Sequence, residues 1–255
     1  MNEEHHYYED PESEPFTRFA RPEETEPPEN ETEEEDAQPE GSKTPVIRSN
    51  DKCFLTGMNQ SGKSVLGRQI ILSMVDQIGV IVYDPNYEHT RLIELTSGEI
   101  INDVSLIKYM PQIKPGQLVL LQPVDDSPAA WSEFCKSVWD NHRNVFIAID
   151  EAHDVCPAKS VLDPYHQYLI RRGRHFGIGM MHISQRPAET HKMPLAQAQH
   201  VMIYKMHLPN DIEYLAGWLQ YRELAEEMQK LEPYWYIYYD VNGGQVYVNP
   251  PVELI

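Results

Sequence analysis

Short apolar runs and longer amphipathic segments alternate along most of the chain. Several apolar runs are continuous, such as residues 79–83 and the run that follows Asn144, residues 145–149. A continuous apolar run of this length is typical of a strand that is buried on both faces, as in a parallel sheet. The segments between the runs have helical periodicity, for example residues 128–141, where Ser127-Pro128 marks the start. The pattern predicts an α/β fold, with a mostly parallel sheet covered by helices.

The remaining predicted elements follow the same alternation. A short helix is expected over residues 103–110, because Pro111 stops it. Asn242-Gly243-Gly244 joins the last two runs as a C-terminal β-hairpin. Its aromatic side chains suit an edge hairpin packed on the sheet better than a platform for stacking bases. The other predicted strands cover residues 53–55, 117–122, 177–183, 200–206, 234–239 and 245–249, and the other helices cover residues 65–74, 209–219 and 221–231.

Residues 1–48 differ from the rest of the chain. They are rich in Glu and Pro, and they hold 16 acidic and four basic residues. Such a segment buries too little apolar surface to offset the entropy of ordering. We therefore expect a disordered acidic tail over residues 1–48 and one domain over residues 49–255. Residues 16–21 contain two aromatic residues and two arginines, and an ordinary disordered segment is favoured there over a short docking motif.

Charge and cysteine usage narrow the function classes. The formal net charge is −19, of which −12 falls on residues 1–48 and −7 on the rest, so no general basic face for nucleic acid is visible. The tail suits either solubility or mimicry of the charge of DNA. No apolar run predicts a membrane span or a signal peptide. Cys53, Cys135 and Cys156 have no paired spacing, which favours buried free thiols in a reducing cytoplasm.

Residues 57–64 read GMNQSGKS and fit the phosphate-binding pattern G-x-x-x-x-G-K-[ST]. In such a P-loop, backbone N–H groups turn inward around phosphate oxygens at the N-terminus of a helix. The glycines allow the turn. Lys63 is expected to reach the β- and γ-phosphates, and Ser64 is expected to bind Mg²⁺. The predicted nucleotide-binding residues are Gly57, Asn59, Gln60, Ser61, Gly62, Lys63, Ser64 and Val65.

A second strand ends in two carboxylates, Asp150 and Glu151. This is the Walker B pattern, in which the first acid holds Mg²⁺ and the second polarises the attacking water. Residues 150–153 spell DEAH, which marks a class of helicases with two RecA-like domains in one chain. The residues after the tail suffice for one such domain, and no second set of helicase motifs is visible. We therefore predict a single RecA-like P-loop NTPase core.

Polar residues also flank the strand predicted at residues 177–183. Gln185 follows its carboxyl end, where it is placed to sense a γ-phosphate or to position water. Arg171, Arg172 and Arg174 precede the strand. Three arginines exceed what a helix end needs to complement its dipole, so an arginine finger acting across a subunit interface is the sharper interpretation. For any single arginine, a surface or ion-pair role is equally well supported.

These motifs occur in a characteristic order. The P-loop is followed by Asp84-Pro85 with Glu88, then by the DEAH strand end, Gly173-Arg174, and Ser-Gln-Arg-Pro at residues 184–187. In this order they resemble the HerA/FtsK superfamily of ring-forming, DNA-pumping ATPases. The resemblance covers residues 50–255. It implies a hexamer with ATP and Mg²⁺ between subunits, double-stranded DNA in the central pore, Gln185 as the sensor, and one of the three arginines as the trans-acting finger.

The departures from the two founding families indicate a particular branch. The chain lacks the N-terminal β-barrel of HerA, and it lacks the membrane spans and C-terminal DNA-reading domain of FtsK. A single compact motor resembles the genome-packaging ATPases of membrane-containing icosahedral viruses. That resemblance implies ATP hydrolysis coupled to DNA translocation, in the host cytoplasm or on the virion, with the acidic tail available to a capsid or vertex protein.

Two alternative functions stay open at this point. One is a plasmid or host motor of the same superfamily for DNA transfer or segregation. The other is an ATP-dependent assembly switch that responds to a protein partner and moves no DNA. Stimulation of hydrolysis by duplex DNA distinguishes a motor from a switch.

Three weaker inferences complete the sequence-based picture of the site. The resemblance places a closing C-terminal segment near the nucleotide base, so residues 249–251 are expected to border the adenine. Lys159 and Lys192 stand on loops after the Walker B and Gln185 strands and are candidate DNA contacts, although a solvated surface role is favoured for each. The eleven histidines show no metal-ligand spacing, so no metal beyond Mg²⁺ is predicted.

Overall fold

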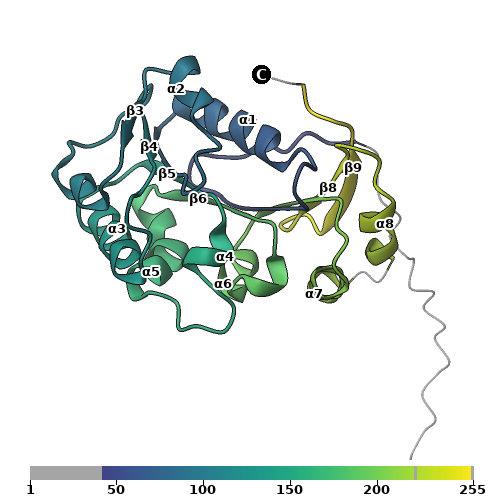
Figure 1. Cartoon of the computed structure of the whole chain (residues 1–255). Coiled ribbons are helices and arrows are strands. Elements are labelled where there is room, and N and C mark those ends of the chain that lie inside the picture. Colours follow the sequence, from purple (N-terminus) through teal and green to yellow (C-terminus); the bar gives the residue numbers. More distant parts are fainter. Residues whose placement is uncertain (1–41, 221–222, 254–255) are drawn as a thin grey trace, which may run out of the picture. The chain divides into compact units, whose positions relative to one another are not determined.

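The computed structural model describes residues 42–220 and 223–253, which belong to one compact unit. Within them, nine strands form one sheet in the order β3-β4-β2-β5-β6-β1-β7-β8-β9 (Figure 1). The first seven in this order are parallel, and the β8–β9 hairpin joins β7 antiparallel. The strands are β1 (Lys52–Thr56), β2 (Gly79–Tyr83), β3 (Glu99–Ile101), β4 (Leu118–Leu121), β5 (Val145–Ile149), β6 (Gly179–Ser184), β7 (His200–Tyr204), β8 (Tyr236–Asp240) and β9 (Gln245–Asn249).

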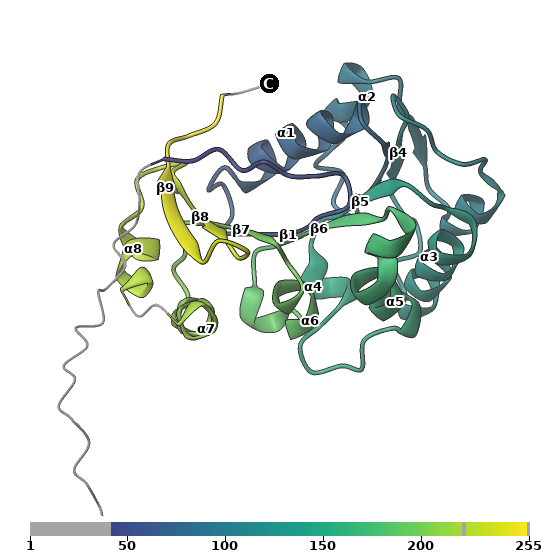
Figure 2. The same cartoon turned by 180° about the vertical axis from the view of Figure 1, so that it is seen from behind.

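Helices cover both faces of the sheet, with α1 and α2 on one face and α3 to α7 on the other (Figures 1 and 2). The α-helices are α1 (Lys63–Val75), α2 (Arg91–Leu95), α3 (Pro128–Asn141), α4 (Ala152–Val155), α5 (Pro164–Arg172), α6 (Lys192–Ala196), α7 (Pro209–Leu219) and α8 (Leu224–Lys230). Three short 3₁₀ helices are η1 (Val104–Tyr109), η2 (Gly173–Phe176) and η3 (Pro187–Glu189).

The continuous apolar runs explain the two covered faces. Successive side chains of a strand point to opposite faces of the sheet. In β2, Val80 and Val82 pack in the cluster under α1, whereas Ile81 and Tyr83 pack in the cluster under α3 and α5. Since both faces of the strand are buried, both sets of positions must be apolar. The α/β fold predicted from the sequence is confirmed, including the mostly parallel sheet and the C-terminal hairpin.

The strand order brings four chemically distinctive strand ends together. In a parallel sheet all carboxyl ends lie along one edge, and β2, β5, β6 and β1 are successive neighbours. Their carboxyl ends lead into Asp84, into Asp150, into Gln185 and into the P-loop, respectively. Ligands of open α/β sheets bind at this edge. The topology therefore gathers residues that are up to 128 positions apart, as the contact between Thr56 and Ser184 shows.

Most predicted element bounds agree with the structure to within a few residues. Ser127 caps α3 through its side chain, as its position before Pro128 predicted. The expected helix at residues 103–110 is the 3₁₀ helix η1, and the three-residue edge strand β3 was not predicted. All three cysteines are buried free thiols, as predicted. Among the described residues, no helix is long and apolar enough to cross a membrane.

Residues 42–48 make specific contacts with the domain, although the sequence analysis assigned them to the tail. Asn249 is buried, and its side-chain oxygen accepts hydrogen bonds from the Ser42 hydroxyl and the Lys43 backbone, each at 2.9 Å. The Lys43 ammonium lies 3.1 Å from Asp240. Ile47 packs against the core cluster under α1. These contacts join residues 42–48 to the domain, while the boundary at residue 48 stays a prediction. The remaining tail, with residues 16–21, lies outside the described residues.

Candidate active site

The P-loop connects the carboxyl end of β1 to the first turn of α1. Gly57 has a φ of 156°, and a Cβ there would lie 2.4 Å from the Cβ of Tyr204, so no side chain fits. Gly62 immediately precedes α1 with a φ of 105°, in the left-handed region that glycine tolerates. The two glycines thus let the backbone pass close to β7 and turn into the helix. This geometry leaves the first N–H groups of α1 free to face an anion.

A cavity of about 670 Å³ opens at the loop. Its lining includes all the predicted nucleotide-binding residues except Gly57, together with four residues from β7 and the C-terminal part of the chain. Lys63 lines it although its residue is only 4% exposed, so the ammonium group is held close to the loop rather than in solvent. The lining residues are Asn59, Gln60, Ser61, Gly62, Lys63, Ser64, Val65, Tyr204, Tyr234, Pro251 and Val252.

Part of the cavity lining is apolar. Pro251, one of the residues predicted to border the base, lines the cavity, whereas Asn249 is engaged with residues 42 and 43. Tyr204 and Tyr234 were not predicted. Their rings lie within 3.3 Å of where a Gly62 Cβ would be, so they pack directly on the loop. Aromatic and proline surfaces of this kind suit the flat face of a nucleobase.

Ser64 lies beside a carboxylate that the sequence analysis quoted only as part of a motif. The Ser64 hydroxyl donates a hydrogen bond of 3.1 Å to Glu88, which follows β2. Hydroxyl and carboxylate oxygens are the donors that Mg²⁺ prefers. Asp150 lies near the same loop: it is close enough to Lys63 for the charge of the ammonium group to lower the pKa of Asp150. The residues therefore fit a hydrated Mg²⁺ held by Ser64 and Asp150.

Asp150 is the buried first acid of the Walker B pair. Burial alone would raise the pKa of Asp150, but the hydrogen bond and charge of His89, with the charge of Lys63, lower it below its usual value. One carboxylate oxygen accepts from His89 Nε2 at 3.1 Å, and the other accepts from the Glu151 backbone N–H at 3.0 Å. Asp150 is therefore a fixed, ionised carboxylate, as a metal ligand requires.

Glu151, the second acid, has a different environment. Its backbone is left-handed, with a φ of 47°, which is uncommon outside glycine and concentrates at functional sites. Burial and the neighbouring charge of Asp150 raise the pKa of Glu151. One carboxylate oxygen accepts a hydrogen bond from the Gln185 side-chain amide. The other accepts no hydrogen bond in the described part of the chain and lies 3.4 Å from His153 Nδ1. This second oxygen can still accept a hydrogen bond from a water molecule.

Gln185 and Glu151 are thus in direct contact, although 34 residues separate them. The next residue, Arg186, has a different role. Its Nε donates to the buried Asp211 at 3.1 Å, and Asp211 also accepts from the backbone of Ala188. This arrangement ties the end of β6 to α7 and fixes the position from which Gln185 projects. Arg186 is consequently a structural residue of the loop.

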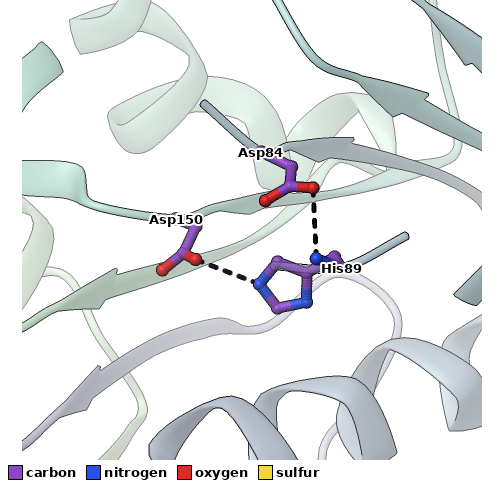
Figure 3. A group of neighbouring side chains, drawn as sticks. All are labelled: Asp84, His89 and Asp150. Carbon is purple, nitrogen blue, oxygen red and sulfur yellow. Dashed lines mark hydrogen bonds and ion pairs between the residues drawn. The ribbon is translucent and has the colours of Figure 1, made fainter. Parts of the chain in front are cut away.

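The residues after β2 form a tight turn around Asp84, which is fully buried (Figure 3). Its carboxylate accepts from the backbone N–H groups of Glu88 and His89 and from the Gln122 amide, at 2.9, 3.1 and 2.9 Å. Asp84, His89 and Asp150 lie close enough to hold a metal ion. The hydrogen bonds already engage both carboxylates of the group, which argues for a structural network.

The three predicted arginines lie at the opposite edge of the sheet. Arg171 and Arg172 end α5, and Arg174 follows in η2, before the amino end of β6. The six residues of β6 separate them from Gln185, a distance of about 20 Å along the strand. All three are exposed, and in the residues described none forms a salt bridge, although Arg172 lies over the Tyr168 ring. They therefore do not reach the P-loop of their own chain.

The comparisons with known proteins agree with this geometry. No protein-family model matches the chain. The DNA packaging ATPase P9 of Enterobacteria phage PRD1 is 27% identical over 176 residues, covering 66% of this chain and 72% of P9. The genome packaging NTPase B204 of Sulfolobus turreted icosahedral virus 2, solved with AMPPCP, has a TM-score of 0.66 and 20% identity, covering 81% of this chain and 100% of that one. VirB4 of Thermoanaerobacter pseudethanolicus has a TM-score of 0.62 and 11% identity, covering 84% and 92%.

These similarities confirm the resemblance that the motif order indicated. The structural likeness, at low sequence identity, shows the RecA-like P-loop ATPase fold. The similarity to P9 extends over most of that protein and is detected in the sequence itself.

Proposed function

We propose that this P-loop ATPase hydrolyses ATP to move double-stranded DNA, and that it packages a viral genome. The observation that carries the proposal is the contact between Gln185 and Glu151 at the edge that also holds the P-loop and Asp150. A water-activating acid held by an amide, beside a phosphate cradle, is the arrangement of a motor ATPase. The similarity to the packaging ATPase P9 supports the biological role.

Each site residue has a defined role in hydrolysis. The P-loop backbone and Lys63 hold the phosphates, and Ser64 and Asp150 hold Mg²⁺, which neutralises phosphate charge when bound. Glu151 orients and polarises the attacking water through the carboxylate oxygen that Gln185 does not hold. Gln185 fixes the other oxygen of Glu151, so a change at the γ-phosphate is transmitted to the end of β6. The raised pKa of Glu151 brings it closer to the pKa of a general base that works near neutrality.

We further propose that the active form is a ring, taken as a hexamer, in which Arg171, Arg172 or Arg174 of one subunit completes the site of its neighbour. The arrangement of the arginines supports this, because they lie on the edge away from their own P-loop and have no salt-bridge partner in the described residues. A guanidinium supplied in trans stabilises the charge of the transition state.

The two loops that carry the candidate DNA contacts lie side by side. Pro157 and Thr190 form an antiparallel bridge, and Ala158 donates a 2.7 Å hydrogen bond to Glu189. Lys159 and Lys192, one on each side of this bridge, are both exposed, but Lys192 is the first residue of α6 and not a loop residue as predicted. The loops follow α4 and Gln185, respectively, so they are mechanically connected to the hydrolysis site. We propose that they contact the DNA backbone, which their charge suits.

The test is the ATPase rate with and without duplex DNA of defined length. A packaging motor is expected to be stimulated by duplex DNA, and Lys159→Ala with Lys192→Ala should reduce the stimulation but not the basal rate. Hydrolysis that DNA leaves unchanged, and that a capsid or vertex protein stimulates, would favour the assembly switch. In a virus, the protein should act in the host cytoplasm and associate with the virion through its acidic tail.

A second candidate is a motor for DNA transfer between cells. The likeness to VirB4 and to the pCW3 conjugation coupling protein TcpA, at TM-scores of 0.62 and 0.53, supports it only at the level of fold. Both motors would be stimulated by DNA. Packaging requires uptake of DNA into a procapsid, so an uptake assay with purified procapsids distinguishes them.

A further inference from the structure

His89 is a buried residue with no assigned role, and it joins two parts of the site. Its side chain is fully buried, and its Nε2 lies 3.1 Å from an oxygen of Asp150 (Figure 3). Its backbone N–H donates to Asp84 at the end of β2. The imidazole therefore spans from the turn after β2 to the acid at the end of the neighbouring strand, β5.

The position of the proton on His89 follows from its partner. A carboxylate can only accept, so the Nε2 that lies 3.1 Å from the Asp150 oxygen carries the hydrogen of this bond. His89 Nδ1 is buried without a hydrogen-bond partner in the described residues.

The bond to His89 fixes the orientation of the Asp150 carboxylate. A free carboxylate at a strand end rotates about its terminal torsion, which has a broad energy minimum. Here one oxygen is held by His89 and the other by the Glu151 N–H, so the plane of the group is defined from both sides. Each oxygen retains a lone pair for a water molecule of the metal shell.

The turn that carries His89 also carries Glu88, whose side chain accepts from Ser64. Asp84 holds this turn through the backbone N–H groups of both residues. Gln122 on the far side donates to Asp84 and to Thr90, at 2.9 and 3.0 Å. One rigid turn therefore contacts both groups that are expected to hold Mg²⁺, Ser64 and Asp150.

We infer that His89 is a positioning residue, which donates from Nε2 to Asp150 and sets this carboxylate in the orientation that binds the hydrated Mg²⁺ of the nucleotide complex. The inference rests on the proposed ATPase function. It differs from a metal centre at Asp84, His89 and Asp150, in which Nε2 would carry a metal ion instead of a proton. Outer partners that orient a metal ligand typically contribute about 10- to 100-fold in metal affinity or activity.

The experiment compares two substitutions of His89, which distinguish loss of the N–H donor from loss of side-chain volume. His89→Gln keeps an N–H donor the same number of bonds from the backbone, and His89→Leu keeps the volume but has no donor. The matched control is His142→Leu, because His142 is equally buried, bonds one backbone oxygen through Nε2 at 2.9 Å, and leaves Nδ1 unpaired. It lies outside the site, between α3 and η1.

The primary readout is binding of Mn²⁺ to the full chain with a non-hydrolysable ATP analogue, measured by electron paramagnetic resonance. His89→Leu should weaken Mn²⁺ binding about 10- to 100-fold and lower kcat similarly, with little change in KM for ATP. His89→Gln should restore most of both. His142→Leu should lower the melting temperature while leaving Mn²⁺ binding unchanged.

Three results would overturn the inference. The first is Mn²⁺ binding by His89→Leu at the wild-type affinity. The second is an equal loss in His89→Gln and His89→Leu, since the donor would then be irrelevant. The third is a shift in melting temperature when Zn²⁺ is added to the nucleotide-free wild type but not to His89→Leu, which would identify a metal centre. If the wild type binds the analogue and Mn²⁺ but hydrolyses nothing, the proposed function fails while the role of His89 is still tested.

Discussion

The two edges of the sheet have opposite chemical organisation. At the carboxyl edge, the acidic and amide side chains of the site are largely buried and contact one another, as Asp150, Glu151 and Gln185 do. At the amino edge, Arg171 and Arg174 are exposed, and no ion pair involving them occurs in the described residues. The carboxyl edge is internally organised and rich in carboxylates, whereas the amino edge presents Arg171 and Arg174 without an ion-pair partner among the described residues.

This difference indicates which functions one chain can perform alone. Phosphate and metal binding need groups fixed in advance, and the buried carboxyl edge provides them. Stabilisation of the transition state by an arginine needs a group that arrives from outside, and an exposed guanidinium at the far edge is available to a second copy. We therefore expect nucleotide binding to be a property of the monomer and hydrolysis to be a property of the assembly.

The largest expected effects are at the carboxyl edge. Lys63→Ala should abolish measurable hydrolysis and weaken ATP binding, because it removes the positive charge at the β- and γ-phosphates. Glu151→Gln should still bind ATP but turn over about 10²- to 10⁴-fold more slowly, since it loses the group that polarises water. Fluorescent-nucleotide binding and phosphate release measure the two properties separately. Near wild-type hydrolysis by Glu151→Gln would remove Glu151 from its role.

The second prediction tests the amino edge. Arg174→Ala should bind ATP in its own P-loop but lose about 10³-fold or more in hydrolysis if it supplies the finger. Mixing it with Lys63→Ala should restore part of the activity, because some interfaces in a mixed ring have an intact half from each subunit. The same titration is run with Arg171→Ala and Arg172→Ala, with phosphate release as the measurement.

The mixing experiment has two decisive outcomes against the ring model. One is the absence of any regained activity for all three arginine variants, although native mass spectrometry shows mixed rings. The other is wild-type activity that stays proportional to protein concentration down to dilutions where only monomer exists. Either result would mean that the comparison of the two edges does not describe the mechanism.

The sequence predicted the motif residues at the carboxyl edge of the sheet, but it did not predict the residues that pack against them. The difference has a physical reason. The P-loop, Asp150 and Gln185 each stand at the end of a strongly apolar run, so their position follows from local periodicity. His89 contacts Asp150 across 61 residues, and Tyr204 meets Gly57 only because β7 is the neighbour of β1. Such contacts depend on strand order, which periodicity does not determine. The position of Tyr204 at the end of a predicted strand was the only feature of the local sequence that pointed to a role in the site.

The third prediction concerns β6, which connects the two edges. His182 of β6 and His166 of α5 are fully buried and share a hydrogen bond of 3.0 Å between their Nε2 atoms. Burial lowers the pKa of His166 to about 3, and burial with the charges of His166 and Lys52 lowers the pKa of His182. Unfolded histidine has a pKa of about 6.5. Between that value and the lower folded values, the unfolded chain binds more protons, so stability falls as the pH falls.

Each of these histidines should therefore reduce the free energy of unfolding by up to about 2 kcal/mol between pH 7 and pH 5. Urea denaturation at the two pH values measures the loss. The double variant His166→Phe with His182→Leu should lose less free energy of unfolding between the two pH values than the wild type. Protonation of carboxylates contributes equally to the loss in both proteins. Equal losses in the two proteins would mean that the pair titrates normally in the folded state.

The smallest expected effect tests whether residues 42–48 belong to the domain. Removal of residues 1–41 should leave the melting temperature unchanged, because a Glu- and Pro-rich segment adds no core. Removal of residues 1–48 leaves the buried Asn249 side chain without its partners, at a cost of about 1–3 kcal/mol. For a domain of this size that corresponds to roughly 2–12 °C in melting temperature.

The same two deletions also test whether residues 42–48 connect the amino edge of the sheet to the nucleotide cavity at the carboxyl edge. Asn249 is two residues before Pro251, which lines the nucleotide cavity, while Lys43 binds Asp240, which pairs with the first residue of β7 at the amino edge. Loss of residues 42–48 should therefore raise KM for ATP modestly, and loss of residues 1–41 alone should not. Melting curves and steady-state kinetics of the two deletions decide the matter. If the shorter deletion already destabilises the protein, the acidic segment contributes to folding. If the longer one changes neither property, the contacts of Asn249 with residues 42 and 43 contribute nothing measurable, and the predicted boundary at residue 48 stands.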